Sequence, residues 1–228
     1  MTPLRGRLTG NTPLVNCHMS NVKCVRVCYT FAMLQTVIFI GRSGSGKGVQ
    51  SGLLQEFLKK EDSETPILYI ETGEHFRRHI KDSGYTWDLA RRVNETGGRQ
   101  PDFLAVWVWT HLFVEKMRGG EHLVFDGTPR SLGEAKMLST ALPFYERKDP
   151  VVVFLNVSRE WAEERLRGRG RPDDTNPEVV NRRLSWYEKD VVPAVEYYRE
   201  NPAYLFLEIN GEQTPAAVFD DIVKQLRK

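Results

Sequence analysis

Cysteine is scarce in this sequence of 228 residues. The chain has three cysteines, Cys17, Cys24 and Cys28, so no disulfide framework can form in the rest of the chain. Their spacing, C-x6-C-x3-C, matches no common zinc-binding pattern, and an odd cysteine count argues against secretion. The sequence therefore favours a cytoplasmic protein with ordinary thiols and no structural zinc.

A hydrophobic run long enough to cross a membrane is also missing. The best candidate, Val27 to Ile40, is interrupted by Thr30, Gln35 and Thr36, whereas a transmembrane helix needs about 20 largely apolar residues. The run could imitate a signal-peptide core, but cleavage after it would remove the first predicted strand. We therefore expect no membrane association.

Acidic residues are absent from residues 1–32, which contain four basic ones. The formal charge of +2 for the whole chain thus becomes −2 for residues 33–228. A nearly neutral body gives no electrostatic reason to expect a nucleic-acid partner. Residues 1–32 also lack clear periodicity, and Met33 is a candidate start. We interpret them as a disordered extension or a misassigned upstream translation; the alternative is a genuine but nonessential tail.

Apolar runs alternate with amphipathic stretches from residue 33 onward, and 40% hydrophobic content allows one substantial core in a single main domain, 33–228. The predicted strands are 35–40, 66–70, 121–126, 150–156 and 203–209. The predicted helices are 47–60, 72–97, 101–118, 131–141, 158–168, 177–200 and 215–227. Strands separated by helices predict an α/β fold with a doubly wound, five-stranded parallel sheet and flanking helices.

A glycine-rich loop, Gly41-Arg42-Ser43-Gly44-Ser45-Gly46-Lys47-Gly48, follows the first predicted strand and opens a helix. This context is typical of a phosphate-binding loop, in which backbone N–H groups surround phosphate oxygens and the lysine reaches the terminal phosphates. The alternative is a simple glycine-rich turn. Gly48 stands where most such loops carry a magnesium-binding Ser or Thr.

The loop resembles that of adenylate kinases and related nucleoside monophosphate kinases, which read G-x-P-G-S-G-K-G-T-Q; Ser43 and Val49 are the two departures. By this resemblance the ATP-binding residues are Gly41, Gly44, Ser45, Gly46, Lys47, Gly48 and Val49. Val49 removes one hydroxyl that could face the phosphates. The resemblance continues in order along almost all of residues 34–228.

Two further segments resemble the acceptor site of that family. The sequence from Glu71 to Arg77 resembles S-T-G-D-x-x-R, which implies that Thr72 lies near the acceptor base and that Arg77 binds its phosphate. An exposed, solvated arginine is the alternative for Arg77. Segment 72–101 would be the monophosphate-binding segment.

The sequence from Asp126 to Arg130 resembles D-G-x-P-R. The match implies that Asp126 orients Mg²⁺ through its water shell, that Gly127 lines the acceptor site, and that the planar fork of Arg130 holds the acceptor phosphate. An Asp-Gly turn at a helix start is the alternative. Glu134 stands where adenylate kinases carry a base-reading glutamine, and because a carboxylate only accepts hydrogen bonds, GMP remains an alternative acceptor.

A basic segment near residue 170 resembles the lid of the same kinases. There Arg165 would stack on the ATP adenine, and Arg169, Arg171 and Arg183 would bind phosphates. Segment 168–175 is shorter than the family's short lids and contains no cysteine. A solvated basic face or a nucleic-acid patch is the alternative interpretation.

The resemblance implies an enzyme of the P-loop kinase class that uses ATP and Mg²⁺ to phosphorylate a nucleoside monophosphate, with AMP + ATP giving 2 ADP as the first choice. We expect a monomer. The implied catalytic residues are Lys47, Arg130, Arg169, Arg171 and Arg183. The alternatives are GMP or another monophosphate as the acceptor, a P-loop kinase for a small metabolite, and a nucleotide-binding module without turnover.

Overall fold

A parallel sheet forms the centre of the protein in a computed structural model that describes residues 34–171 and 174–227. Its strand order is β2-β3-β1-β4-β5. The strands are β1 (Thr36–Gly41), β2 (Ile67–Glu71), β3 (His122–Asp126), β4 (Val151–Asn156) and β5 (Leu205–Asn210). The predicted fold class, a five-stranded parallel α/β sheet, is confirmed. The predicted extension, residues 1–32, lies outside the described residues.

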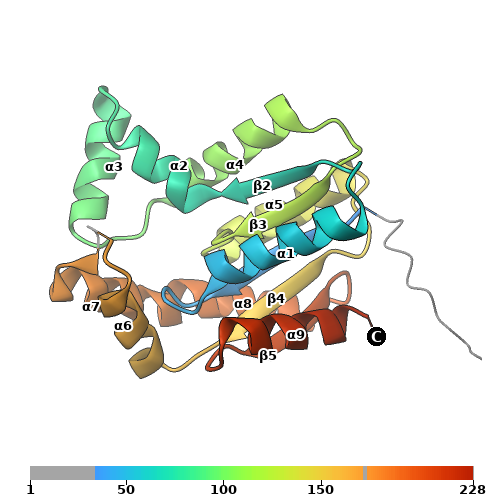
Figure 1. Cartoon of the computed structure of the whole chain (residues 1–228). Helices are drawn as coiled ribbons and strands as arrows, with labels where there is room; N and C mark the ends of the chain where they lie inside the picture. Colours follow the sequence, from blue (N-terminus) through green and yellow to red (C-terminus); the bar gives the residue numbers. More distant parts are fainter. Residues whose placement is uncertain (1–33, 172–173, 228) are drawn as a thin grey trace, which may run out of the picture.

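Helices cover both faces of the sheet (Figure 1). They are α1 (Lys47–Glu61), α2 (Thr72–His79), α3 (Tyr85–Glu95), α4 (Asp102–Lys116), α5 (Leu132–Phe144), α6 (Arg159–Gly168), α7 (Pro177–Trp186), α8 (Val192–Glu200) and α9 (Pro215–Leu226).

Two of the predicted helices are each broken into parts. The stretch 72–97 becomes α2 and α3, separated at Gly84, whose φ of 129° no other residue type adopts easily. The stretch 177–200 becomes α7 and α8, joined by a π-helical segment, Tyr187–Val191, just before Pro193. Proline cannot donate the usual helical hydrogen bond, and π-helical segments accommodate such interruptions.

The alternation of side chains along β1 builds two hydrophobic cores. Ile38 and Ile40 point to one face and pack with buried residues of α4, α5 and α8. Val37 and Phe39 point to the other face and pack with α1 and α9. Because both faces are covered, the central residues of β1, β3 and β4 are continuously apolar. This rigid base fixes the loops that leave the carboxyl ends of the strands.

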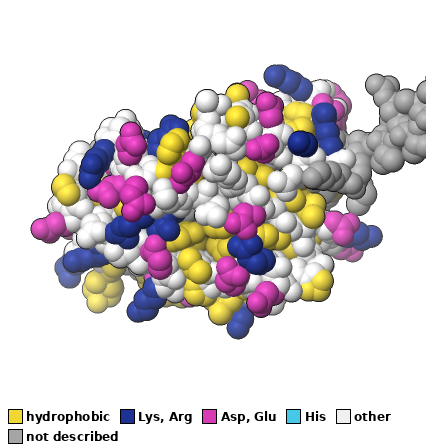
Figure 2. All heavy atoms as spheres, turned by 90° about the horizontal axis from the view of Figure 1, so that it is seen from below, with side chains coloured by type: hydrophobic (Ala, Val, Ile, Leu, Met, Phe, Trp, Pro, Cys, Tyr) yellow, Lys and Arg dark blue, Asp and Glu magenta, His cyan; other side chains and the backbone are white. Residues whose placement is uncertain are grey.

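The outer surface mixes charges of both signs. Figure 2 shows Lys and Arg side chains interspersed with Asp and Glu over the face seen from below Figure 1, with hydrophobic side chains between them. Within residues 34–171 and 174–227, no helix combines the length and apolarity that a membrane crossing requires.

Candidate active site

The glycine-rich loop connects β1 to α1 and lies at the carboxyl end of the sheet, where ligands bind in doubly wound folds. Gly44 has a φ of 88°, and a Cβ atom there would lie 2.5 Å from the carbonyl oxygen of Ala162. Only glycine fits this position. Lys47 folds back over the loop, where its Nζ donates to the carbonyl oxygens of Gly41 (2.8 Å) and Arg42 (2.7 Å).

A cavity of about 860 Å³ opens beside this loop. It lies between α2 and α3 on one side and α6 and α7 on the other, which project beyond the sheet in Figure 1. Its lining includes most of the residues predicted from the sequence: Gly44, Ser45, Gly46, Lys47, Gly48, Val49, Arg77, Asp126, Gly127, Arg130, Arg165, Arg169, Arg171 and Arg183. Gly41, Thr72 and Glu134 are predicted residues that do not line it.

Positive charge dominates the cavity wall. Among the described lining residues, eight are Lys or Arg and three, Glu71, Asp126 and Glu164, are acidic, which gives a net charge of +5. Residues 33–228 as a whole carry −2, so the cationic groups are concentrated at this one place. Such a site favours ligands with several negative charges.

Lys47 and Asp126 face each other at the base of the cavity. Burial lowers the pKa of Lys47 to about 8, opposed by the nearby Asp126 and assisted by Arg130 and Arg169. Burial also raises the pKa of Asp126, whereas Lys47 lowers it and Glu71 raises it. The Oδ2 atom of Asp126 accepts a hydrogen bond from Tyr69 at 3.0 Å. Asp126 is thus fixed in place beside the loop.

The arginine of the D-G-x-P-R motif lies against its own glycine. Arg130 Nε donates to the carbonyl oxygen of Gly127 at 2.6 Å. Gly127 has a φ of 68°, and a Cβ atom there would lie 3.0 Å from Arg130 Nη2. A side chain at position 127 would therefore displace the guanidinium from the cavity wall.

Thr72 is buried behind the cavity. Its Oγ1 lies 2.7 Å from Thr128 Oγ1 and 3.3 Å from the carbonyl oxygen of Gly127. In this structure Thr72 connects the start of α2 to the loop after β3, and its predicted proximity to the acceptor base stays a prediction.

Glu134 is buried at the start of α5. Its backbone N–H donates to Ser131 Oγ, and its carboxylate accepts from the backbone N–H of Arg130 at 3.2 Å and from Arg99 at 3.4 Å. Burial raises the pKa of Glu134 to about 7, against the opposing effect of Arg130 and Arg99. These contacts give Glu134 a structural role at the helix start; its predicted role in reading the base stays a prediction.

Replacement of Glu134 by glutamine is expected to change the pH dependence of stability. A raised pKa means that folded Glu134 keeps a proton that the unfolded chain releases between pH 4.5 and about 7. Its contribution to the free energy of unfolding therefore falls as pH rises through this window, by at most about 3 kcal/mol. We expect the Glu134→Gln variant to show a flatter pH profile of urea unfolding, whereas Glu95→Gln at the exposed end of α3 leaves the profile unchanged. If the free energy of unfolding of Glu134→Gln changed with pH as steeply as that of the parent, the raised pKa of Glu134 would be contradicted.

Two of the lid arginines, Arg169 and Arg183, pair with the same carboxylate. Asp174 is buried and accepts from Arg169 through two contacts, 2.7 Å and 3.0 Å, and from Arg183 at 2.8 Å. Of the predicted lid segment 168–175, residues 172–173 lie outside the described residues. Arg169 and Arg183 come from different helix ends, so Asp174 sets the distance between them.

Replacement of Asp174 by asparagine is expected to disorder both arginines. Two guanidinium groups that lose a shared buried carboxylate repel each other, and this should lower kcat by about tenfold to a hundredfold as well as the melting temperature. Glu163→Gln is a matched control, because Glu163 pairs with Arg167 on the exposed side of α6. A variant with unchanged kcat would show that the pairing is not needed for turnover.

Arg165 lies over the ring of Trp161, with its guanidinium carbon 4.8 Å from the ring centroid. Both line the cavity together with Gln213 and Pro215, which follow β5. A flat cationic side chain stacked on an aromatic ring suits a planar base. This part of the wall is consistent with the predicted stacking of Arg165 on adenine.

The lining and supporting residues that the sequence does not predict include four that carry or bind charge: Tyr69, Glu71, Arg99 and Asp174. Tyr69 and Glu71 sit two apart at the carboxyl end of β2, so period-two alternation could have placed both beside Asp126. Asp174 lies within the quoted lid segment. Arg99, which contacts Asp102, Glu134 and Asp190, gives no such signal, because only the tertiary structure joins these elements.

The residues present fit a nucleotide phosphate chain and its Mg²⁺. Glycine backbone around a helix start offers N–H groups to phosphate oxygens, and Asp126 is a buried carboxylate 3.2 Å from where a Cβ of Gly48 would lie. Oxygen ligands and water suit Mg²⁺. Among the residues of the chain that the structure describes, there is no group of three or more His, Cys, Asp or Glu that could hold a metal by itself.

A glycine loop, a buried lysine, an acidic residue on the neighbouring strand and converging arginines define a P-loop phosphotransferase. The family model for adenylate kinase matches residues 39–203. The chain is 34% identical to an adenylate kinase of Azobacteroides pseudotrichonymphae over 85% of this chain and 97% of that protein. It is 31% identical to one of Oenococcus oeni (79% and 92%) and 32% identical to one of Bacteroides fragilis (84% and 97%).

The chain belongs to the adenylate kinase family. It is therefore a nucleoside monophosphate kinase that uses ATP and Mg²⁺. The comparisons support AMP as the acceptor and do not favour the alternatives of GMP, a small metabolite or binding without turnover.

Proposed function

We propose that this cavity transfers the γ-phosphoryl group of ATP to AMP by holding two phosphates in line among positive charges. The observation that supports the proposal is that one cavity collects Lys47, Arg77, Arg130, Arg169 and Arg183 around Asp126. Phosphoryl transfer needs positioning and charge neutralisation more than covalent chemistry. No general base is required, because the attacking group is already a phosphate oxygen.

The residues divide between the two substrates. Lys47 and the loop N–H groups bind the ATP phosphates, with Arg165 against the adenine. Arg77 and Arg130 bind the acceptor phosphate from the opposite wall. Arg169, Arg171 and Arg183 stabilise the charge on the transferred group. Asp126 would hold the Mg²⁺ that enters with ATP through the water shell of the ion, and the ion would supply charge neutralisation at the phosphates.

Two segments are proposed to move. Segment 72–101, with α2 and α3, would be the monophosphate-binding part, and segment 168–175 would be the lid. Both border the cavity. Their closure would exclude water, which would otherwise accept the phosphoryl group.

The decisive experiment measures ADP formation from ATP with a panel of AMP, GMP, CMP and UMP. We expect AMP to give the highest kcat/KM. The same panel tests whether Glu134 reads the base: Glu134→Gln should raise the ratio of kcat/KM for AMP over GMP by about tenfold. No turnover with any monophosphate would overturn the proposed function, and an unchanged ratio would remove Glu134 from base recognition.

A further part of the proposal concerns the cellular compartment, the oligomeric state and the binding partners. We infer a cytoplasmic monomer whose partners are nucleotides, without nucleic-acid or membrane binding. The near-neutral charge of residues 33–228 and the interspersed charges in Figure 2 support this. Light scattering after gel filtration, with and without a DNA fragment, tests it.

A further inference from the structure

An additional carboxylate lies inside the acceptor half of the cavity. Glu71 is the last residue of β2 and pairs in register with Asp126 of β3. It stands at the position where the motif quoted above, S-T-G-D-x-x-R, has serine. An anion at this place faces the groups that must bind an anionic substrate.

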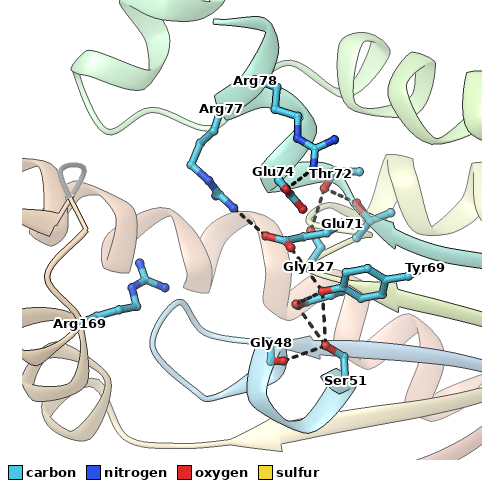
Figure 3. A network of polar contacts seen from close by, with 12 residues as sticks. Gly48, Ser51, Tyr69, Glu71, Thr72, Glu74, Arg77, Arg78, Gly127 and Arg169 are labelled. Atoms are coloured by element: carbon cyan, nitrogen blue, oxygen red, sulfur yellow. Dashed lines mark hydrogen bonds and ion pairs between the residues drawn. The ribbon is translucent and has the colours of Figure 1, made fainter. Parts of the chain in front are cut away.

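The partner of Glu71 is the arginine assigned to the acceptor phosphate. Arg77 Nη2 lies 2.7 Å from Glu71 Oε1. The hydroxyl of Tyr69 lies 3.3 Å from the other oxygen, Glu71 Oε2, and 3.0 Å from Asp126 Oδ2, so its single proton is shared between the two carboxylates. Figure 3 shows Arg77 extending from α2 to Glu71, while Arg169 approaches from the opposite wall.

The same carboxylate lies close to a point where two guanidinium groups converge. A Cβ atom on Gly73 would lie 3.0 Å from Arg130 Nη2, 3.2 Å from Arg77 Nη1 and 3.9 Å from Glu71 Oε1. The two arginines therefore border one small space, and Glu71 lies at its edge. Two guanidinium groups that converge in this way suit a phosphate group.

We propose that Glu71 is a positioning residue that holds Arg77 until the acceptor phosphate replaces it. The proposal rests on the function proposed above. The carboxylate occupies Arg77 in the empty site, so monophosphate binding must first break this ion pair. The apparent dissociation constant for AMP then equals the intrinsic constant divided by the fraction of molecules in which Arg77 is free.

The expected change in AMP affinity depends on how exposed the ion pair between Arg77 and Glu71 is. The side chains of Arg77 and Glu71 are 38% and 22% exposed, and partly exposed ion pairs are weak. We therefore expect the pair to weaken AMP binding by about two- to fivefold.

Titration calorimetry of AMP without ATP tests the proposal independently of turnover. Glu71→Gln should lower the dissociation constant for AMP two- to fivefold. Glu74→Gln is the matched control, since Glu74 also lies on this segment and pairs with the neighbouring Arg78, and it should leave the constant unchanged. Weaker or unchanged AMP binding by Glu71→Gln would overturn the proposal.

A double-mutant cycle shows whether Glu71 acts through Arg77. In an Arg77→Met background the effect of Glu71→Gln should disappear, because the pair no longer exists. An effect that persists would indicate simple charge repulsion and would overturn the proposal. A change confined to the Mg²⁺ dependence of ATP binding would also overturn it and assign Glu71 to the metal. If the parent protein does not bind AMP, the proposed function itself fails, which is a distinct outcome.

Discussion

Lys47→Met is expected to remove nearly all turnover, by about 10³-fold or more in kcat. Lys47 lines the cavity and interacts with Asp126, whereas Arg42, the other cation of the glycine loop, pairs with Glu188 outside the cavity lining. Methionine keeps the length and apolar volume of the stem and removes the charge. The loss should therefore appear in kcat for the ATP reaction, measured by a coupled ADP assay.

The fold should survive this substitution. Lys47 carries a pKa lowered by burial, so its charged form is not what stabilises the empty protein, and the melting temperature of Lys47→Met should equal or exceed that of the parent. Lys59→Met, at the exposed end of α1, is the control and should keep full activity. A Lys47→Met protein with parental kcat would refute the phosphate-loop assignment.

Arg130→Met is expected to lower kcat/KM for AMP on the order of 10³-fold, with little change in ATP affinity. Arg130 is held against Gly127 and points into the acceptor half of the cavity. Its planar fork can contact two phosphate oxygens at once. Steady-state kinetics with varied AMP, together with ATP binding by calorimetry, separates the two substrates.

Two further variants make this prediction specific. Arg130→Lys keeps the charge but not the fork, so its activity should fall between those of the parent and Arg130→Met. Arg92→Met, on the exposed side of α3, should be indistinguishable from the parent. Equal losses of AMP and ATP binding in Arg130→Met would mean that Arg130 does not distinguish the two sites.

The order of elements and the position of the chemistry could be predicted from the sequence. Strand β1 is a continuous apolar run followed by glycines, and Asp126 ends a strand of the same kind. Parallel strands bring their carboxyl ends to one edge, so motifs 80 residues apart meet there, and this is why Lys47, Asp126 and Arg130 line one cavity.

The partners of the charged residues could not be predicted in the same way. An arginine side chain reaches any of several carboxylates, and periodicity does not indicate which one. Glu71 pairs with Arg77, and Asp174 joins Arg169 and Arg183. The position of Glu134 relative to Arg130 predicts that it reads the base, whereas its contacts with Arg99 and with the backbone of Arg130 are known only from the structure. The breaks at Gly84 and at Tyr187–Val191 likewise depend on local geometry rather than on amphipathic pattern.

The excess of positive charge on the cavity wall has a consequence for the stability of the protein. The cavity is lined by eight basic residues and three acidic ones, so the basic residues repel each other whenever no anion lies between them. Without a phosphate, Arg77 pairs with Glu71, and Arg169 and Arg183 pair with Asp174. The phosphates of a bound nucleotide neutralise this positive charge, and nucleotides bind the folded chain and not the unfolded one. The melting temperature accordingly rises with nucleotide concentration and, because salt screens the same repulsion, the gain shrinks as ionic strength increases.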